Sequence, residues 1–198
     1  MITLYHSPNS RSTSVLALLR ELGAEEKVTI RRVEIPRADG SGARDPANPH
    51  PEGKVPFLTN GADTVRERGA IFTYLCEIFP DAGMAPMPGE EGRGAFLSWM
   101  AYYQGVIEPV FVLNMLGLDN PRLQATFRGL PEITEALTAA LSQGPWLLGE
   151  SYSAADLLIA SPFLWFPELC PDHPVVRDWV ARAGERPSAL WAKQRDDA

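Results

Sequence analysis

A proline stands before a short apolar run in the first third of the chain, and the residues that follow it strongly constrain the local secondary structure. A strand-like run covers 55–58 around Pro56, the pair Asn60-Gly61 supplies a turn, and a second extended run follows at 63–65. An Asn-Gly pair between two such runs is typical of a β-hairpin. The acid Glu67 then opens a helical pattern, so the sequence predicts a hairpin followed by a helix.

The same segment predicts a binding edge. An X-Pro bond adopts the cis form at a cost of only about 0.5–1 kcal/mol, and a cis bond at Val55-Pro56 turns the N–H and C=O of Val55 toward an extended ligand. The helix that starts near Glu67 offers unpaired N–H groups and the positive end of its dipole, which favour a carboxylate. Glu67 and Arg68 can therefore grip an amine and an acid, as in a small peptide-like ligand.

The remaining N-terminal pattern predicts an α/β fold. Residues 2–5 form a strand pattern, residues 15–22 a helical stripe that a glycine ends, and residues 28–30 a second strand. Residues 36–53 carry Pro, Gly, Asp and Asn at a density that excludes regular structure over most of their length. The order βαβ followed by ββα is that of thioredoxin-like folds.

A Pro- and Gly-rich stretch at 81–87 predicts a linker between an N-terminal domain at 1–80 and an all-helical domain at 88–198. Strand periodicity vanishes after this linker and a helical period replaces it. Pro109 is expected to kink one long helical run. Within Ser153–Asp156 the serine and the aspartate have the spacing of a helix capping box.

Composition excludes several classes of function. The net charge is −7, and no dense basic run appears, which argues against nucleic acid as a partner. No apolar segment approaches the ~20 residues that a membrane span requires, and no targeting pattern opens the chain, so a cytoplasmic location is expected. Cys76 and Cys170 lie far apart and outside any metal-ligand spacing, so we expect neither a disulfide scaffold nor a metal site.

Taken in order, these motifs resemble those of the cytosolic glutathione transferase superfamily, over nearly all 198 residues. The matching segments are Ser7–Ser10, Asn48–Pro56, Glu67–Leu75, Gly149–Asp156 and Arg186–Ser188. The resemblance implies an α/β thioredoxin-like N-terminal domain plus an all-α C-terminal domain. It also implies a homodimer with glutathione as co-substrate, in which the glutathione thiolate is conjugated to small hydrophobic electrophiles in a detoxification reaction.

Several residues gain an expected role from the resemblance. Val55 and Pro56 would pair with the glutathione backbone, and His50 with Lys54 would hold the glycyl carboxylate. Family members usually carry Ser or Thr after the acid to hold the γ-glutamyl carboxylate, and this chain has Arg68 instead. An arginine can pair with a carboxylate bidentately; the alternative is that it faces solvent and leaves only the backbone donor.

The glutathione thiol must ionise before it attacks, and a free thiol has a pKa of about 8.5. Residues 10–12 lie where the field of the first helix points. Ser10 is the first choice for the thiolate stabiliser, because Ser7–Ser10 resembles the serine-type members, whose hydroxyl donates to sulfur. A plain helix cap by Ser10 or Ser12 is the alternative, and Arg11 either stabilises the thiolate by charge or faces solvent.

Other candidate residues carry weaker patterns. Tyr5 ends a strand, where other family members use a tyrosine hydroxyl; the alternative, which we favour, is core packing with a solvated hydroxyl. His6 and His173 have no partner pattern and are expected at the surface or in turns. The second substrate should lie against aromatic and apolar side chains of the helical domain. The candidates for this substrate pocket are Tyr102, Tyr103, Phe111, Met115 and Trp165.

Two other functions remain open. One is a non-catalytic protein of this fold that binds a macromolecular partner, with Arg68 marking a decayed site. The other is a glutathione-dependent reductase or isomerase, although reductases of this fold usually carry an active cysteine where this chain has Ser10 or Arg11.

Overall fold

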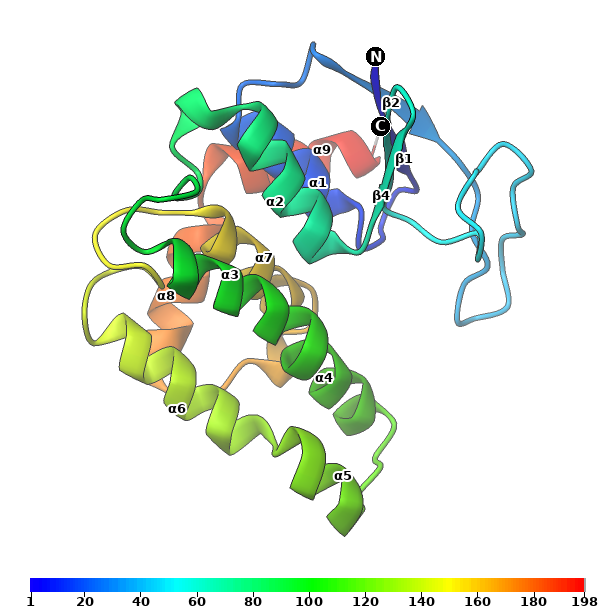
Figure 1. Ribbon diagram of the computed structural model, residues 1–198. Coiled ribbons are helices and arrows are strands. Elements are labelled where there is room, and N and C mark those ends of the chain that lie inside the picture. The colour runs from blue at the N-terminus through cyan, green and yellow to red at the C-terminus, as the bar shows by residue number, and fades with distance from the viewer. Residues whose placement is uncertain (198) are drawn as a thin grey trace. The chain divides into compact units, whose positions relative to one another are not determined.

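The structure is a computed structural model that describes residues 1–197, and its contacts divide the chain into two compact units (Figure 1). Unit 1 comprises Met1–Met84 together with the end of the chain from Arg186, and unit 2 comprises Ala85–Glu185. This division differs from the predicted one, because the last helix packs with the N-terminal unit although it follows the helical unit in sequence.

Unit 1 is built on a sheet with the strand order β2-β1-β3-β4. Its strands are β1 (Ile2–His6), β2 (Val28–Arg32), β3 (Phe57–Asn60) and β4 (Asp63–Arg66), and its helices are α1 (Thr13–Glu21), α2 (Arg68–Ile78) and α9 (Pro187–Asp197). β2 runs parallel to β1, whereas β3 runs antiparallel to both β1 and β4. This arrangement confirms the predicted thioredoxin-like α/β fold.

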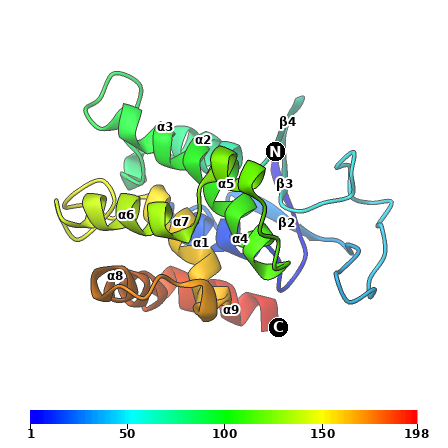
Figure 2. The ribbon, with the colours of Figure 1, turned by 90° about the horizontal axis from the view of Figure 1, so that it is seen from below.

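Apolar side chains of α1 and α2 bury one face of the sheet. Leu4 and Leu58 on adjacent strands are fully buried, as are Leu18 of α1 and Leu75 of α2. The segment 33–56 contains no helix or strand, as predicted for residues 36–53, and extends on the opposite side of the sheet from these helices (Figures 1 and 2). The predicted hairpin is also confirmed, since Gly61 turns the chain from β3 to β4 with a φ of +61°.

Unit 2 consists of helices, and no strand follows Arg66 within residues 1–197. The helices are α3 (Arg93–Tyr102), α4 (Glu108–Met115), α5 (Pro121–Phe127), α6 (Leu130–Leu141), α7 (Ala154–Trp165) and α8 (Pro174–Gly184). A π-helical turn at Tyr103–Ile107 joins α3 to α4. Pro109, the second residue of α4, lacks the N–H that would continue the regular hydrogen-bond ladder. In the described part of the chain no helix is both long and apolar enough for a membrane span.

A fully buried carboxylate holds the core of unit 2 together. Asp156 Oδ1 accepts hydrogen bonds from the Leu147 N–H at 2.8 Å and from the Trp179 indole at 3.0 Å. Asp156 Oδ2 accepts from the N–H and the hydroxyl of Ser153, both at 2.9 Å, which completes the predicted capping box at the start of α7. Burial raises the pKa of Asp156 above its usual value, although these four hydrogen bonds oppose the rise.

The last helix is tied to unit 1 at its beginning. Arg186, just before α9, donates to both carboxylate oxygens of Glu21 at 2.6 and 2.8 Å, and the Ser188 hydroxyl donates to the same group at 2.5 Å. Glu21 lies at the end of α1, so α1 and α9 run side by side in opposite directions (Figure 1). The sequence patterns did not predict α9 as a separate helix.

The cluster around Asp156 yields the first prediction. Asp156→Ala leaves a buried indole N–H and two buried backbone N–H groups without their acceptor, so we expect the free energy of unfolding to fall by at least about 3 kcal/mol. Ser153→Ala, which removes only the cap hydroxyl, is expected to cost about 1 kcal/mol. Urea unfolding of the three proteins measures both losses, and equal losses in the two variants would contradict the central role of the carboxylate.

Candidate functional site

Strand register brings the predicted site segments to one end of the sheet. In the ladder between β1 and β3, Tyr5 pairs with Phe57, and Phe57 pairs in turn with Arg66 of β4. The residues that leave β1, enter β3 and leave β4 therefore lie side by side. These residues are the three segments that the sequence analysis assigned to one ligand: Ser7–Ser12, Val55–Pro56 and Glu67–Arg68.

Two helix N-termini face the same end. α1 begins at Thr13 directly after the first segment, and α2 begins at Arg68 directly after the last. Their unpaired N–H groups and dipoles make this end of the sheet favourable for anions. Glu67, the residue before α2, is exposed and has a φ of +69°, a strained conformation for a side chain of this size that is typical of functional sites.

The binding segment ahead of β3 has the expected backbone form. The Val55-Pro56 bond is cis, and both residues are buried just outside the ladder that starts at Phe57. Lys54 is exposed and forms a salt bridge of 2.5 Å with Glu52.

His50 belongs to the same loop but is buried, and its ring packs edge-on against Phe57 with centroids 5.3 Å apart. Its Nδ1 accepts a hydrogen bond from the Glu52 N–H at 3.0 Å, and burial lowers the pKa of His50. The ring is therefore neutral with its proton on Nε2, so it offers one hydrogen-bond donor and no full charge.

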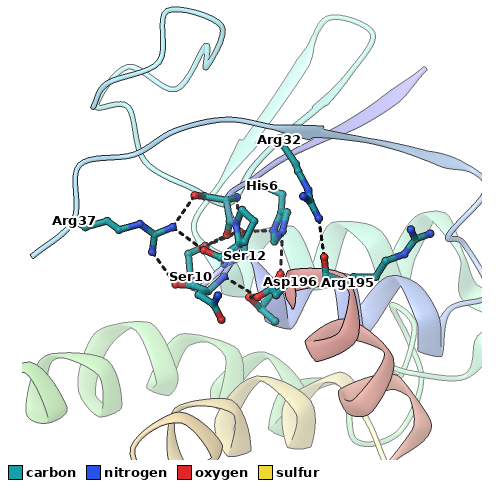
Figure 3. A network of polar contacts seen from close by, with 11 residues as sticks. His6, Ser10, Ser12, Arg32, Arg37, Arg195 and Asp196 are labelled. Carbon is teal, nitrogen blue, oxygen red and sulfur yellow. Dashed lines mark hydrogen bonds and ion pairs between the residues drawn. The ribbon is translucent and has the colours of Figure 1, made fainter. Parts of the chain in front are cut away.

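The three candidate thiolate stabilisers differ in position. Ser10 is partly exposed, and its hydroxyl donates to the Ser7 carbonyl at 2.7 Å. Ser12 is fully buried, and its oxygen lies 2.7 Å from the Ser10 oxygen and 2.7 Å from His6 Nδ1 (Figure 3). Arg11 is exposed. Of the two serines, only Ser10 has a hydroxyl with access to a ligand.

His6 was predicted at the surface or in a turn, and this prediction was wrong. The side chain is 1% exposed, and Nε2 lies 3.1 Å from Asp196 Oδ1 near the end of α9. Thr13 and the N–H of Asn9 donate to the other oxygen of Asp196. Burial raises the pKa of Asp196, but the close contact with His6 and the hydrogen bonds from Thr13 and Asn9 outweigh it, so the net pKa is lowered.

An arginine from the irregular segment lies over the loop that follows β1. Arg37 donates to Ser7 Oγ at 3.2 Å, to the Pro8 carbonyl at 2.8 Å and to the Asn9 carbonyl at 3.1 Å (Figure 3). Beside it is a hollow of about 380 Å³ lined by residues of this loop and of the segment after β2. The sequence did not predict a role for Arg37, because nothing in its local pattern shows where this segment folds back.

The proposed pocket residues of unit 2 fall into two groups. Tyr103 is fully buried and donates to Glu108 at 2.5 Å, and Phe111 is buried against Phe163 with ring centroids 5.1 Å apart. Tyr102 is partly exposed, and Met115 and Trp165 are 56% and 44% exposed. The two buried side chains contribute to the core of unit 2, whereas the other three have surface that a ligand can reach.

Within residues 1–197 no three His, Cys, Asp or Glu side chains gather as metal ligands. Both cysteines are free thiols; Cys76 is buried in α2 and Cys170 lies in unit 2. Neither belongs to the loop after β1.

Comparisons with known proteins agree with this architecture. The sequence matches the family profile described as "Glutathione S-transferase, N-terminal domain" over residues 4–83 and "Glutathione S-transferase, C-terminal domain" over residues 106–187. It is 28% identical over 160 residues to glutathione S-transferase F14 of Arabidopsis thaliana, covering 71% of this chain and 63% of that protein. It is 25% identical over 210 residues to the disulfide-bond oxidoreductase YfcG of Escherichia coli (strain K12), covering 95% and 92%.

A solved structure shows the same fold. The crystal structure of a glutathione transferase from Methylococcus capsulatus strain Bath superposes with a TM-score of 0.78 at 26% sequence identity, covering 100% of this chain and 99% of that chain. Together with the two family profiles, this likeness shows that the chain belongs to the glutathione transferase superfamily.

The carboxylates that anchor α9 yield the second prediction. The pKa values of Asp196 and Glu21 are both lowered by their hydrogen bonds despite burial, so their contribution to stability is complete above about pH 5 and is lost as the pH falls through the folded-state values. We expect the free energy of unfolding to decline below about pH 4, and the decline to be shallower in Asp196→Asn. Urea titrations of both proteins between pH 3 and 7 measure the free energy of unfolding. The same decline below pH 4 in wild type and in Asp196→Asn would contradict the stabilising role of the Asp196 carboxylate.

Proposed function

We propose that this protein is a glutathione transferase that conjugates the glutathione thiolate to small hydrophobic electrophiles. The observation that carries the proposal is the strand register, which gathers a partly exposed hydroxyl, a cis-Pro edge and an acid at a helix start beside two helix N-termini. This is the arrangement that a tripeptide with a thiol and two carboxylates requires.

Each part of glutathione then has a partner. The backbone of Val55 pairs with the cysteinyl residue of glutathione, and Glu67 receives the ammonium group of its γ-glutamyl end. The start of α2 and the buried Arg68 receive the γ-glutamyl carboxylate. Lys54 and the Nε2–H of His50 receive the glycyl carboxylate.

These contacts leave the thiol at the loop between β1 and α1. The Ser10 hydroxyl donates to the developing thiolate, and the N-terminal field of α1 adds positive potential at the same place. Lowering the thiol pKa in this way increases the fraction of thiolate at neutral pH, which is the species that attacks an electrophile.

Fewer residues can be assigned to the hydrophobic electrophile than to glutathione. We propose that the accessible side chains of unit 2, Tyr102, Met115 and Trp165, provide its apolar contacts, since these three combine exposure with apolar surface. Tyr103 and Phe111 support them from the core.

A glutathione-dependent reductase is the second candidate function. The similarity to YfcG, a disulfide-bond oxidoreductase, favours it. The positions of Cys76 and Cys170 disfavour a mechanism with a protein thiol, because neither cysteine lies in the loop that follows β1. In such an enzyme the thiol chemistry would have to come from glutathione alone.

One experiment with three readouts tests these functions. The purified protein is applied to immobilised glutathione, then assayed for conjugation of glutathione to an aryl halide and for reduction of a small disulfide by glutathione. We expect retention and conjugation. Retention with reduction alone would favour the reductase, and absence of retention would favour a non-catalytic protein of this fold.

The third prediction concerns the acid before α2. Glu67→Gln keeps the shape of the side chain but loses a charge-assisted hydrogen bond worth roughly 1.5–3 kcal/mol, so the dissociation constant for glutathione should rise about tenfold or more. The control is Glu26→Gln, which neutralises an exposed carboxylate in the turn before β2. Titration calorimetry measures both variants, and an unchanged affinity in Glu67→Gln would refute the assigned ammonium site.

The fourth prediction concerns assembly. We propose that the protein acts as a homodimer in the cytoplasm, as its family implies. Sedimentation velocity at micromolar concentration should then give the mass of two chains of 21.8 kDa. A single species at the mass of one chain would refute the dimer.

A further inference from the structure

A continuous chain of polar atoms connects the partly exposed Ser10 to the buried carboxylate of Asp196 (Figure 3). The Ser10 and Ser12 oxygens are 2.7 Å apart, and the Ser12 oxygen is 2.7 Å from His6 Nδ1. His6 Nε2 is then 3.1 Å from Asp196 Oδ1. Ser12 and His6 are at most 1% exposed, so the interior of this chain is shielded from water.

The ionised carboxylate of Asp196 fixes which atom donates and which accepts at each step of this chain of polar atoms. Asp196 is an acceptor only, so the tautomer of His6 that suits its 3.1 Å contact carries the proton on Nε2 and presents a bare Nδ1. The Ser12 hydroxyl donates to that Nδ1, while the N–H of Ser7 donates to the Ser12 oxygen at 3.2 Å. The Ser10 hydroxyl then donates either to the Ser12 oxygen or to the Ser7 carbonyl, both 2.7 Å away, and the first of these orientations completes the chain. In this state the chain is ready to accept a proton at its Ser10 end.

We propose that His6 takes up the proton of the glutathione thiol through Ser10 and Ser12, and that Asp196 holds the imidazolium that results. This inference rests on the proposed function. The thiol S–H proton passes to the Ser10 oxygen, the Ser10 proton to the Ser12 oxygen, and the Ser12 proton to His6 Nδ1. One S–H bond is broken and one N–H bond is formed, which leaves a thiolate at the site and a buried ion pair beneath it.

The end state also orients Ser10 for the thiolate. Once Nδ1 is protonated it donates to the Ser12 oxygen, and the Ser12 hydroxyl turns to donate to the Ser10 oxygen. The hydroxyl of Ser10 is then directed at the sulfur. The same proton transfer therefore forms the thiolate and supplies its hydrogen-bond donor.

The charges around His6 favour this uptake. Asp196 faces its ring directly, and the lowered pKa of that carboxyl keeps it ionised at neutral pH. Arg32, the register partner of His6 on β2, is exposed and donates to the Arg195 carbonyl at 2.7 Å, and Arg37 donates to Ser7 Oγ. Both guanidinium groups donate to oxygen atoms of other residues, and the Asp196 carboxylate is the charged group in direct contact with the imidazole.

Asp196→Asn provides the sharpest test, because it preserves the shape of the side chain but reverses the direction of the hydrogen bonds between Asp196 and Ser10. An asparagine amide can donate to His6 Nε2, which would place the histidine proton on Nδ1, where no further proton can be accepted from Ser12. We expect the pKa of the bound glutathione thiol, read by ultraviolet absorbance of the thiolate, to rise by at least about one unit. Turnover should fall about tenfold at pH 6.5 and much less at pH 8.5, while the dissociation constant stays within about twofold.

The control variant is Glu21→Gln, which weakens the attachment of α9 at its opposite end without touching the proton path. It should lower stability and leave the thiol pKa unchanged. If both variants shift the thiol pKa equally, Asp196 acts only by holding α9 in place and the relay is refuted. Failure of the wild-type protein to bind glutathione would overturn the proposed function and the relay together, whereas tight binding with equal thiol pKa values in wild type and Asp196→Asn would overturn the relay alone.

A measurement on the wild-type protein does not depend on any variant folding. Nitrogen-15 NMR of the imidazole rings at pH 7, with His6 assigned by comparison with His50→Gln and His173→Gln, reports the protonation of each ring nitrogen. We expect His6 to be protonated on Nε2 alone in the free protein and on both nitrogens when glutathione is bound. A ring that stays neutral in the complex would refute the proposal.

Discussion

The antiparallel ladder between β1 and β3 is the interaction on which the rest of the site depends. Leu4 pairs with Leu58 and Tyr5 with Phe57, and the two leucines are fully buried. Because side chains alternate between the two faces of a strand, a slip of one residue would expose this apolar set, which fixes the register strongly. The same register sets the Ser7–Ser12 loop beside the Val55-Pro56 edge, so core packing and site geometry have one cause.

The end of the chain contributes to this site because α9 returns to unit 1. Its first residues bind Glu21 at the end of α1, and Asp196 binds Thr13 at the beginning of α1. Carboxylates therefore hold both ends of α9. They are mostly buried and each accepts several hydrogen bonds, which is the condition under which such contacts stabilise a fold. Residues more than 180 positions apart thereby become neighbours, and a residue near the end of the chain can act on the loop after β1.

Local patterns were sufficient to predict part of this structure. The hairpin after Pro56 and the capping box at Ser153–Asp156 depend on residues within a few positions of one another, and both are confirmed. The pairing of His6 with Asp196 depends on the path of the whole chain, so no local pattern could indicate it. Tyr103 was proposed for the substrate pocket because it lies in an apolar helical stripe, but such a stripe also describes the core, where the structure places it.

The division of work between Ser10 and Ser12 follows from burial. A hydroxyl that touches a ligand must have accessible surface, and of these two serines only Ser10 has it. A buried hydroxyl must instead satisfy its hydrogen bonds within the protein, and Ser12 does so with groups on both sides of it. Hydroxyl groups linked by hydrogen bonds polarise one another, so the protonation state of a buried imidazole affects the charge on an accessible hydroxyl oxygen. Ser10, Ser12 and His6 thus connect the accessible part of the loop after β1, which carries neither a cysteine nor a tyrosine, to the buried carboxylate of Asp196.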